Sequence, residues 1–293
     1  MEVDLFGPLP SPVDLVELRS VRFALGELVL LAIAGGLLGA WIVLRRLAFF
    51  SHAVGTATFP GLVVAEAAGL SPRIAALAVA LGYAGGVERV GRRGRDPGDA
   101  ATALGLVFAL AAGVVLASDV FESGASVDRL LFGTAIGLEV GDLVLAAVTA
   151  ALAAGATVLL GRAWSAAGFD PEGAPALGLP VSRADLLLLV LVAVAAVAAL
   201  PAVGTLLVAS IFVVPAATAR LFARDVGALL RWSVAIAMLQ GVAGLYLSLW
   251  LDVPPGPAVA VLGTGVYAIC AGLLALRGRG APRASTAAAE GVA

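Results

Sequence analysis

The histidine and a threonine of one apolar stretch are the residues best suited to bind a metal ion. The stretch reads LRRLAFFSHAVGTATFPGLVVAEAAGL over residues 44–70, and it contains His52, the only histidine of the chain. Thr56 lies four residues further, on the same face of a helix. Neutral imidazole is a good ligand for zinc and also serves manganese and iron. Ion binding by His52 and Thr56 is therefore one hypothesis, and a histidine hydrogen-bonded between helices is the other.

A proline in the same stretch predicts an interruption of its helix. Pro60 has no N–H to donate, so the carbonyl of Thr56 loses its helical partner. That carbonyl lies one turn from His52 and adds an oxygen that an ion could bind. We expect the helix to break at Pro60 and Gly61, although a proline that merely kinks the helix would give the same pattern.

A second apolar stretch also contains a proline. It reads VGTLLVASIFVVPAATARLFARD over residues 203–225. Pro215 frees a carbonyl one turn earlier, and we expect a helix break there as well. After Ala219 the stretch becomes basic, with Arg220 and Arg224 among apolar residues. This pattern predicts a short amphipathic helix at the inner surface, either docked into a cytoplasmic partner or resting on anionic lipid headgroups.

Two glutamates within apolar stretches are the remaining candidates for an ion pathway. Glu27 lies in the first long apolar stretch, and Glu66 lies near the end of the second. Ionisable side chains within a membrane are costly and usually face the interior of a bundle or a water-filled cavity. The alternative is that each carboxylate reaches toward water at a helix end. Such sparse acids argue against a proton-driven pump.

The elements that position these residues are predicted to be membrane-spanning helices. Hydrophobic residues make up 61% of the chain, charged residues 13%, and the mean hydropathy is +1.06. A soluble domain of this size could not bury that much apolar surface, so the fold is expected to be an all-α transmembrane bundle of eight or nine spans. The expected spans are 22–44, 48–68, 72–88, 101–118, 140–161, 184–200, 203–221, 232–251 and 257–276. A short partial helix is also expected within 125–139, and the sixth and seventh spans are divided at Pro201.

The orientation of the bundle follows from its arginines, because basic residues stay on the cytoplasmic side of short loops. With the amino terminus outside, only Arg19, Arg22, Arg73 and Arg129 fall on the outer side. Residues 1–21 are then an extracytoplasmic segment, 22–276 the membrane domain, and 277–293 a cytoplasmic, disordered tail. The chain is accordingly placed in the cell membrane as a multi-pass protein. The outer side also gathers acids that would favour cations, or that are simply tolerated there.

Several classes of function are disfavoured by the same sequence. The formal net charge of −2 points to no nucleic-acid partner. The chain has no glycine-lysine phosphate loop and no lysine at all, so any ATP hydrolysis must occur on a separate subunit. No cluster of polar groups typical of an enzyme is found. An ion-coupled secondary transporter would need paired repeats with buried acids, which the sparse acids and the odd number of spans do not favour.

Five segments together resemble the permease subunits of ABC-type zinc, manganese and iron importers, over roughly residues 22–276. The resemblance implies a homodimer with the pathway near its twofold axis, cytoplasmic ATP-binding subunits and an extracytoplasmic metal-binding protein. It implies transport by alternating access, with zinc before manganese as cargo and no permanently bound cofactor. It also implies that the inner helix after PAATAR, with Ala219, Arg220, Arg224 and Asp225, couples to the ATPase. The segments are VLRRLAFFSHAVGTATFPG at 43–61, DAATALGLVFALAAGVVLAS at 99–118, LLFGTAIGLEVGDL at 130–143, VGTLLVASIFVVPAATARLF at 203–222 and GLYLSLWLDVPPGPAVAV at 244–261.

The likeness departs from the family at the metal-facing residues. The family stretch typically reads like LRRMSLMGDAISHAVLPG, with an aspartate and a histidine one turn apart. Aligned without a gap, the aspartate position falls on His52 and the histidine position on Thr56. Losing a carboxylate weakens the binding of hard ions and favours zinc over manganese. It also leaves open a permease for an iron chelate or another substrate.

Overall fold

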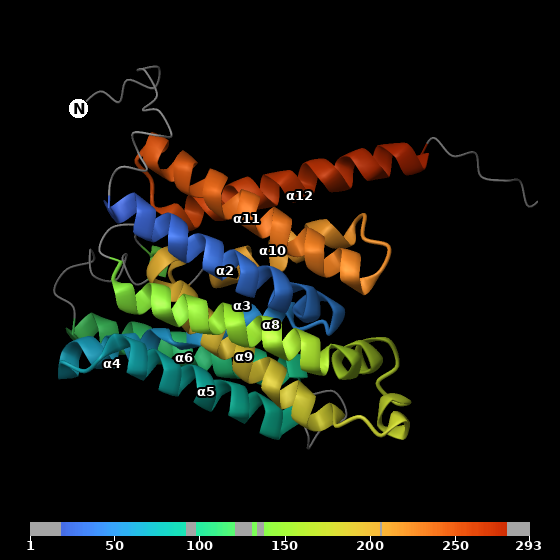
Figure 1. Ribbon diagram of the computed structural model, residues 1–293. Coiled ribbons are helices and arrows are strands. Elements are labelled where there is room, and N and C mark those ends of the chain that lie inside the picture. The colour runs from blue at the N-terminus through green and yellow to red at the C-terminus, as the bar shows by residue number, and fades with distance from the viewer. Residues whose placement is uncertain (1–18, 92–97, 121–130, 134–137, 206, 280–293) are drawn as a thin grey trace, which may run out of the picture.

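The computed structural model describes residues 19–91, 98–120, 131–133, 138–205 and 207–279, and all regular elements in these ranges are helices. Figure 1 shows them packed side by side in one bundle. The all-α class predicted from the sequence is therefore confirmed. The elements are α2 (Arg19–Leu44), α3 (Ala48–Ala57), α4 (Phe59–Ala68), α5 (Pro72–Gly91), α6 (Gly98–Val120), α8 (Val140–Phe169), the 3-10 helix η1 (Ala174–Leu177), α9 (Val181–Val203), α10 (Val208–Arg220), α11 (Val226–Leu251) and α12 (Pro255–Arg279).

The expected number of spans agrees with the helices of the described residues. Seven segments are long and apolar enough to cross a membrane, and α3 and α4 together form one of them. The apolar α10 is shorter, and α5 is a helix of 20 residues that carries charged side chains at both ends. With these two, the described part of the chain has nine helical segments in the bundle, as the apolar stretches predicted.

Helix α2 lies at the centre of the packing and contacts α8, α10 and α11. Its glycines allow the backbones of neighbouring helices to approach closely. Small residues are common at such contacts, because in lipid no hydrophobic driving force brings helices together and close packing must do so. A Cβ on Gly36 would lie 2.5 Å from Cα of Val234, and a Cβ on Gly39 would collide with the carbonyl oxygen of Phe212. The helices α2, α10 and α11 therefore touch along their main chains.

Two tryptophans join α2 to α8 and α9. The rings of Trp41 and Trp164 lie 5.3 Å apart between centroids, and both side chains are buried. Each indole N–H finds an acceptor: Trp41 donates to the hydroxyl of Thr157 at 3.1 Å, and Trp164 donates to the carbonyl of Ala184 at 2.8 Å. Large apolar rings whose single polar atom is satisfied are well suited to fix the relative position of buried helices.

The loops gather at two opposite ends of the bundle. Figure 1 shows the turns that follow α2, α8 and α10 at one end, and the turns that follow α4 and α11 at the other. The first end carries Arg45, Arg46, Arg220 and Arg224, and it is the end that the arginine distribution assigns to the cytoplasm. Large apolar side chains such as Phe108 and Val158 are exposed on the outside of the bundle, where a membrane protein meets lipid.

Three expectations about local structure need correction. Helix α10 continues through Pro215 to Arg220, so no break occurs there; a proline removes a single donor, and the surrounding turns hold. Helix α9 likewise continues past Pro201 and ends at Val203, before Gly204 with φ of 74°. Most of the expected partial helix within 125–139 lies outside the described residues.

The third correction concerns the stretch after Ala219, where a separate surface helix was expected. Helix α10 ends at Arg220, residues 221–225 form a turn, and the next helix is already the long α11. Asp225 causes this early start, because its carboxylate accepts from the backbone N–H of Ala228 at 2.7 Å and caps the new helix. The basic residues therefore stand on a tight turn between two membrane helices.

Candidate functional site

His52 begins the second turn of α3, six residues before a discontinuity of the helix at Thr58. The imidazole is partly buried, and the structure describes no hydrogen bond to it. Thr56 is 2% exposed, and its hydroxyl donates to the backbone carbonyl of His52 at 3.2 Å. The threonine oxygen keeps lone pairs for an ion, whereas the hydroxyl proton is already used. His52 and the Thr56 hydroxyl oxygen thus lie one helical turn apart on the same face of α3, and the structure describes no hydrogen bond to the imidazole.

The discontinuity at Thr58 divides the second span into α3 and α4. Helix α3 ends at Ala57, α4 begins at Phe59, and Pro60 lies in the first turn of α4. Thr58 stabilises the junction, since its hydroxyl donates to the carbonyl of Gly55 at 2.6 Å. Pro60 cannot supply the N–H that the carbonyl of Thr56 would receive in a continuous helix.

The two candidate glutamates lie away from His52. Glu27 is fully buried in α2, and neither of its carboxylate oxygens has a hydrogen-bond partner. The charges that act on it are Asp142, which repels it, and Arg73, which attracts it. Glu66 is exposed near the end of α4. These acids and His52 do not form one cluster, and no group of three potential metal ligands among His, Cys, Asp and Glu occurs in the part of the chain that the structure describes.

An ion-pair cluster at the expected outer end was not predicted from the sequence. Arg73, at the start of α5, donates to Asp142 at 3.0 Å and to Glu139 at 3.1 Å. Glu139 and Asp142 also cap α8 reciprocally, with the backbone N–H of Glu139 donating to Asp142 at 2.9 Å. The acidic pair three residues apart before an apolar run is a sequence signal for such a cap, but its partner Arg73 is 66 residues or more away in the chain.

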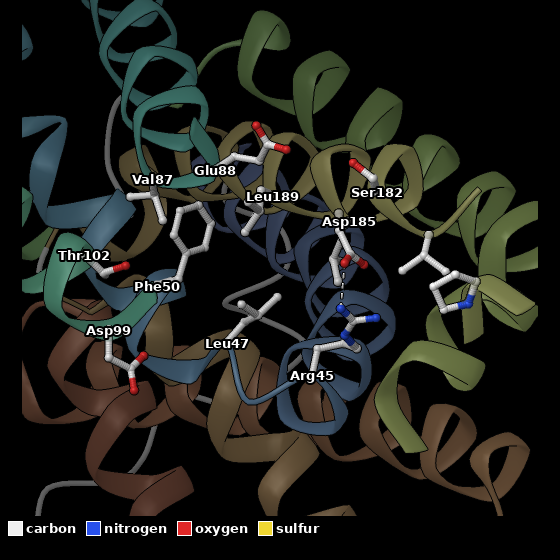
Figure 2. Close-up of a pocket in the computed structure, with 13 residues that line it drawn as sticks. Arg45, Leu47, Phe50, Val87, Glu88, Asp99, Thr102, Ser182, Asp185 and Leu189 are labelled. Atoms are coloured by element: carbon white, nitrogen blue, oxygen red, sulfur yellow. Dashed lines mark hydrogen bonds and ion pairs between the residues drawn. The ribbon is translucent and has the colours of Figure 1, made fainter. Parts of the chain in front are cut away.

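A cavity of about 460 Å³ lies at the opposite end, which is the expected cytoplasmic end. Figure 2 shows Arg45 paired with Asp185 on one side of it and Asp99 with Thr102 on the other. The pair is 2.8 Å long and joins the end of α2 to the start of the second turn of α9. Carboxylates outnumber arginine around the cavity, so its lining is acidic. The lining residues are Arg45, Leu47, Phe50, Val87, Glu88, Asp99, Thr102, Pro175, Val181, Ser182, Asp185, Leu188 and Leu189.

The turn between α10 and α11 projects at the same end of the bundle. Ala219 is buried, whereas Arg220, Arg224 and Asp225 are exposed. The guanidinium of Arg220 donates to the carbonyl of Val43 at 3.4 Å, which connects the turn to the end of α2. Exposed arginines on a short turn that is anchored to two helices can bind an acidic partner surface and transmit its movement.

Comparison with known proteins places this geometry in a family. The model of the ABC 3 transport family matches residues 19–273. The manganese transport system membrane protein MntC of Halalkalibacterium halodurans is 29% identical over 256 residues, which are 87% of this chain and 88% of that protein. The high-affinity zinc uptake system membrane protein ZnuB of Haemophilus influenzae is 24% identical, over 82% of this chain and 92% of that protein.

Two solved structures share the fold. PsaBC from Streptococcus pneumoniae in complex with Fab superposes with a TM-score of 0.77 at 24% identity, over 88% of this chain and 93% of that chain. An inward-facing conformation of a metal-chelate type ABC transporter gives a TM-score of 0.73 at 14% identity, over 93% of this chain and 92% of that chain. The family model covers nearly the whole described bundle, so the chain belongs to the ABC 3 transport family, whose members are multi-pass membrane permeases.

Proposed function

We propose that this permease imports a divalent transition-metal ion, zinc before manganese, and that His52 and Thr56 bind the ion on its way. The observation that carries the proposal is the match of most of the chain to manganese and zinc transport membrane proteins. The imidazole without a hydrogen bond, beside a threonine oxygen inside a membrane span, supports it.

A single chain offers too few ligands to hold an ion alone. His52 and Thr56 supply one nitrogen and one oxygen, and zinc prefers four ligands. In our proposal two copies of the chain face each other, so that each contributes one such pair to a pathway near the twofold axis. Glu66, exposed near the expected outer end of α4, then serves as an entry residue, and Glu27, buried in α2, is the second acid proposed for the pathway.

The energy for transport comes, in this proposal, from ATP hydrolysis on separate cytoplasmic subunits. Those subunits bind the turn that carries Arg220, Arg224 and Asp225, next to the buried Ala219. An extracytoplasmic metal-binding protein delivers the ion to the end opposite that turn. Residues 1–21 lie on the delivery side and 277–293 in the cytoplasm, and most of both segments falls outside the described residues.

Reconstitution tests the proposal. The chain is placed in liposomes with its ATP-binding subunit and binding protein, and uptake of labelled zinc and manganese is measured with ATP, without ATP and without the ATPase. We expect uptake of both ions only in the complete system, with tighter binding of zinc. Uptake by the chain alone would contradict the proposal.

A second candidate cargo is an iron chelate. The observation that favours it is the absence of the family aspartate at the position of His52, which removes a charge that attracts free cations. Competition separates the two cargoes, because excess free zinc or manganese blocks uptake of labelled metal ion but leaves uptake of a bulky chelate unchanged.

A further inference from the structure

Two tryptophans on the outside of α11 indicate where this helix meets the two surfaces of the bilayer. Trp232 and Trp250 are 18 residues apart, which is about five turns of an α-helix, so both lie on one face. Their side chains are 51% and 44% exposed, and Leu239 between them is 70% exposed. At 1.5 Å per residue the two tryptophans are separated by about 27 Å, close to the ~30 Å hydrocarbon layer. Because tryptophan is enriched at membrane–water interfaces, the spacing indicates that this face contacts lipid, with Trp232 at the expected cytoplasmic interface.

The turn between α10 and α11 packs an aromatic ring against Trp232. Phe222 belongs to this turn and is 42% exposed. Its ring lies 5.6 Å from the Trp232 ring between centroids, at an interplanar angle of 85°. Edge-to-face contact of this kind is favourable for aromatic pairs. The Phe222–Trp232 pair therefore forms an exposed aromatic surface at one end of the lipid-facing side of α11, and it connects the turn to that level of the membrane.

Arg231, next to Trp232, directs its charge toward the same turn. A Cβ on Gly227 would lie 3.4 Å from Nη1 of Arg231, so the guanidinium lies over the first turn of α11, which begins at Val226. Glycine at position 227 leaves room for it. Arginines near the ends of membrane helices extend in this way, with the apolar stem along the helix and the charge at the headgroups. Arg231 is exposed, so its guanidinium can reach a lipid phosphate.

The guanidinium of Arg231 is not engaged by another group of the chain. Among the residues that the structure describes, its side chain forms no ion pair and no hydrogen bond. The acid close to it is Asp225, whose Oδ1 would lie 3.2 Å from the same Cβ on Gly227 but already accepts from the backbone N–H of Ala228. Residues 220–231 contain three arginines and one acid, so the segment is positive. Basic segments at the cytoplasmic surface of a membrane attract anionic lipids.

We propose that Arg231 and the Phe222–Trp232 pair form a binding site for an anionic phospholipid of the cytoplasmic leaflet. The guanidinium offers parallel N–H donors to the phosphate, and the two rings lie beside the glycerol and the upper acyl chains. Arg220 is engaged differently, since it donates to the carbonyl of Val43 at the end of α2. The bound lipid holds the outer side of the turn at the membrane surface. The site does not depend on which ion the permease transports.

Quenching of tryptophan fluorescence by brominated lipids tests the site. The four tryptophans of the chain include Trp41 and Trp164, which are buried, so Trp250→Phe leaves Trp232 as the tryptophan open to lipid. The full chain is reconstituted in phosphatidylcholine that contains increasing amounts of dibrominated phosphatidylglycerol or of dibrominated phosphatidylcholine. We expect half-maximal quenching at an about fivefold lower content of the anionic lipid, as contact with one basic side chain provides. Arg231→Gln should remove this preference, and Arg231→Lys should retain most of it.

Two controls lie elsewhere in the same chain. Arg162→Gln removes another exposed arginine, on α8, and should leave the preference at Trp232 unchanged. In a Trp232→Phe chain the fluorescence reports on Trp250, which is followed by Asp252, and both brominated lipids should quench it equally. Equal quenching of Trp232 by the two lipids, or a preference that survives Arg231→Gln, would overturn the proposal. Quenching by neither lipid would overturn it too, because a second copy of the chain or another protein would then cover this face.

Discussion

His52 is the only imidazole of the chain, and the described structure gives no hydrogen bond to its ring. The sequence left open a histidine bound between helices. The ring is only partly buried, so it is open to an ion as well as to a partner outside the described chain.

Replacement of His52 gives the first prediction at the residue scale. His52→Ala should lower zinc uptake about tenfold or more, since an imidazole ligand is lost. His52→Asp restores the family carboxylate and should move the preference from zinc toward manganese, because carboxylates suit harder ions. Uptake by reconstituted transporter and ATPase stimulation are measured together. Wild-type uptake by His52→Ala with normal ATPase activity would remove His52 from the pathway.

The sequence could identify only those polar residues whose neighbours along the chain are apolar. His52, Thr56 and Glu27 stand out because each interrupts an apolar run. Thr205 does not stand out, because its burial and the missing hydrogen-bond partner of its hydroxyl depend on tertiary packing. The partners Arg73 and Asp142 were equally hidden, since their pairing requires knowing which helices are adjacent.

At the scale of elements, the lengths of the apolar runs predicted where the helices lie. The positions of the prolines were poorer predictors of where the helices end. The expected span 257–276 became Pro255–Arg279, and the break expected near Pro60 lies at Thr58. Pro215, however, lies within an unbroken helix. Proline removes one donor in every case, but whether the helix ends depends on the packing of the turns around it, which local sequence does not contain.

Glycine packing gives the prediction at the element scale. Gly39→Ala places a methyl group against the carbonyl oxygen of Phe212 and should destabilise the bundle by about 1–3 kcal/mol, as overpacking does. Gly155 is an exposed glycine of α8 with no atom near its missing Cβ. Gly155→Ala should be neutral or stabilising by up to about 1 kcal/mol through helix propensity. Melting temperatures in detergent compare the two, and equal melting would contradict the close contact.

At the scale of the whole molecule, the charges sort the bundle into two chemically different ends. One end holds the exposed arginines of the turn between α10 and α11, and the other holds the cluster of Arg73, Glu139 and Asp142. The all-α architecture, the span number and the membrane location could be inferred from composition and apolar length. Pairings between distant helices could not, because they depend on tertiary contacts.

Charge reversal tests the partner assigned to the cytoplasmic end. Arg220→Glu with Arg224→Glu should reduce the ATPase retained on the purified permease about tenfold, because attraction to an acidic surface becomes repulsion. Arg162→Glu is the matched control, as Arg162 is exposed on α8, outside the turn. Copurified ATPase and ATP-driven uptake are the measurements. Full assembly and uptake in the double variant would show that the ATPase binds elsewhere.

The main-chain contacts of α2 with α10 and α11 have a mechanical consequence. Gly36 and Gly39 leave no layer of side chains that could absorb a small displacement between these helices. We therefore expect α2, α10 and α11 to move as one rigid unit when the turn between α10 and α11 is displaced. The divided span formed by α3 and α4 contacts α2 far less than α10 and α11 do. Such a rigid unit would carry a displacement of this turn to the opposite end of the bundle, where α2 begins.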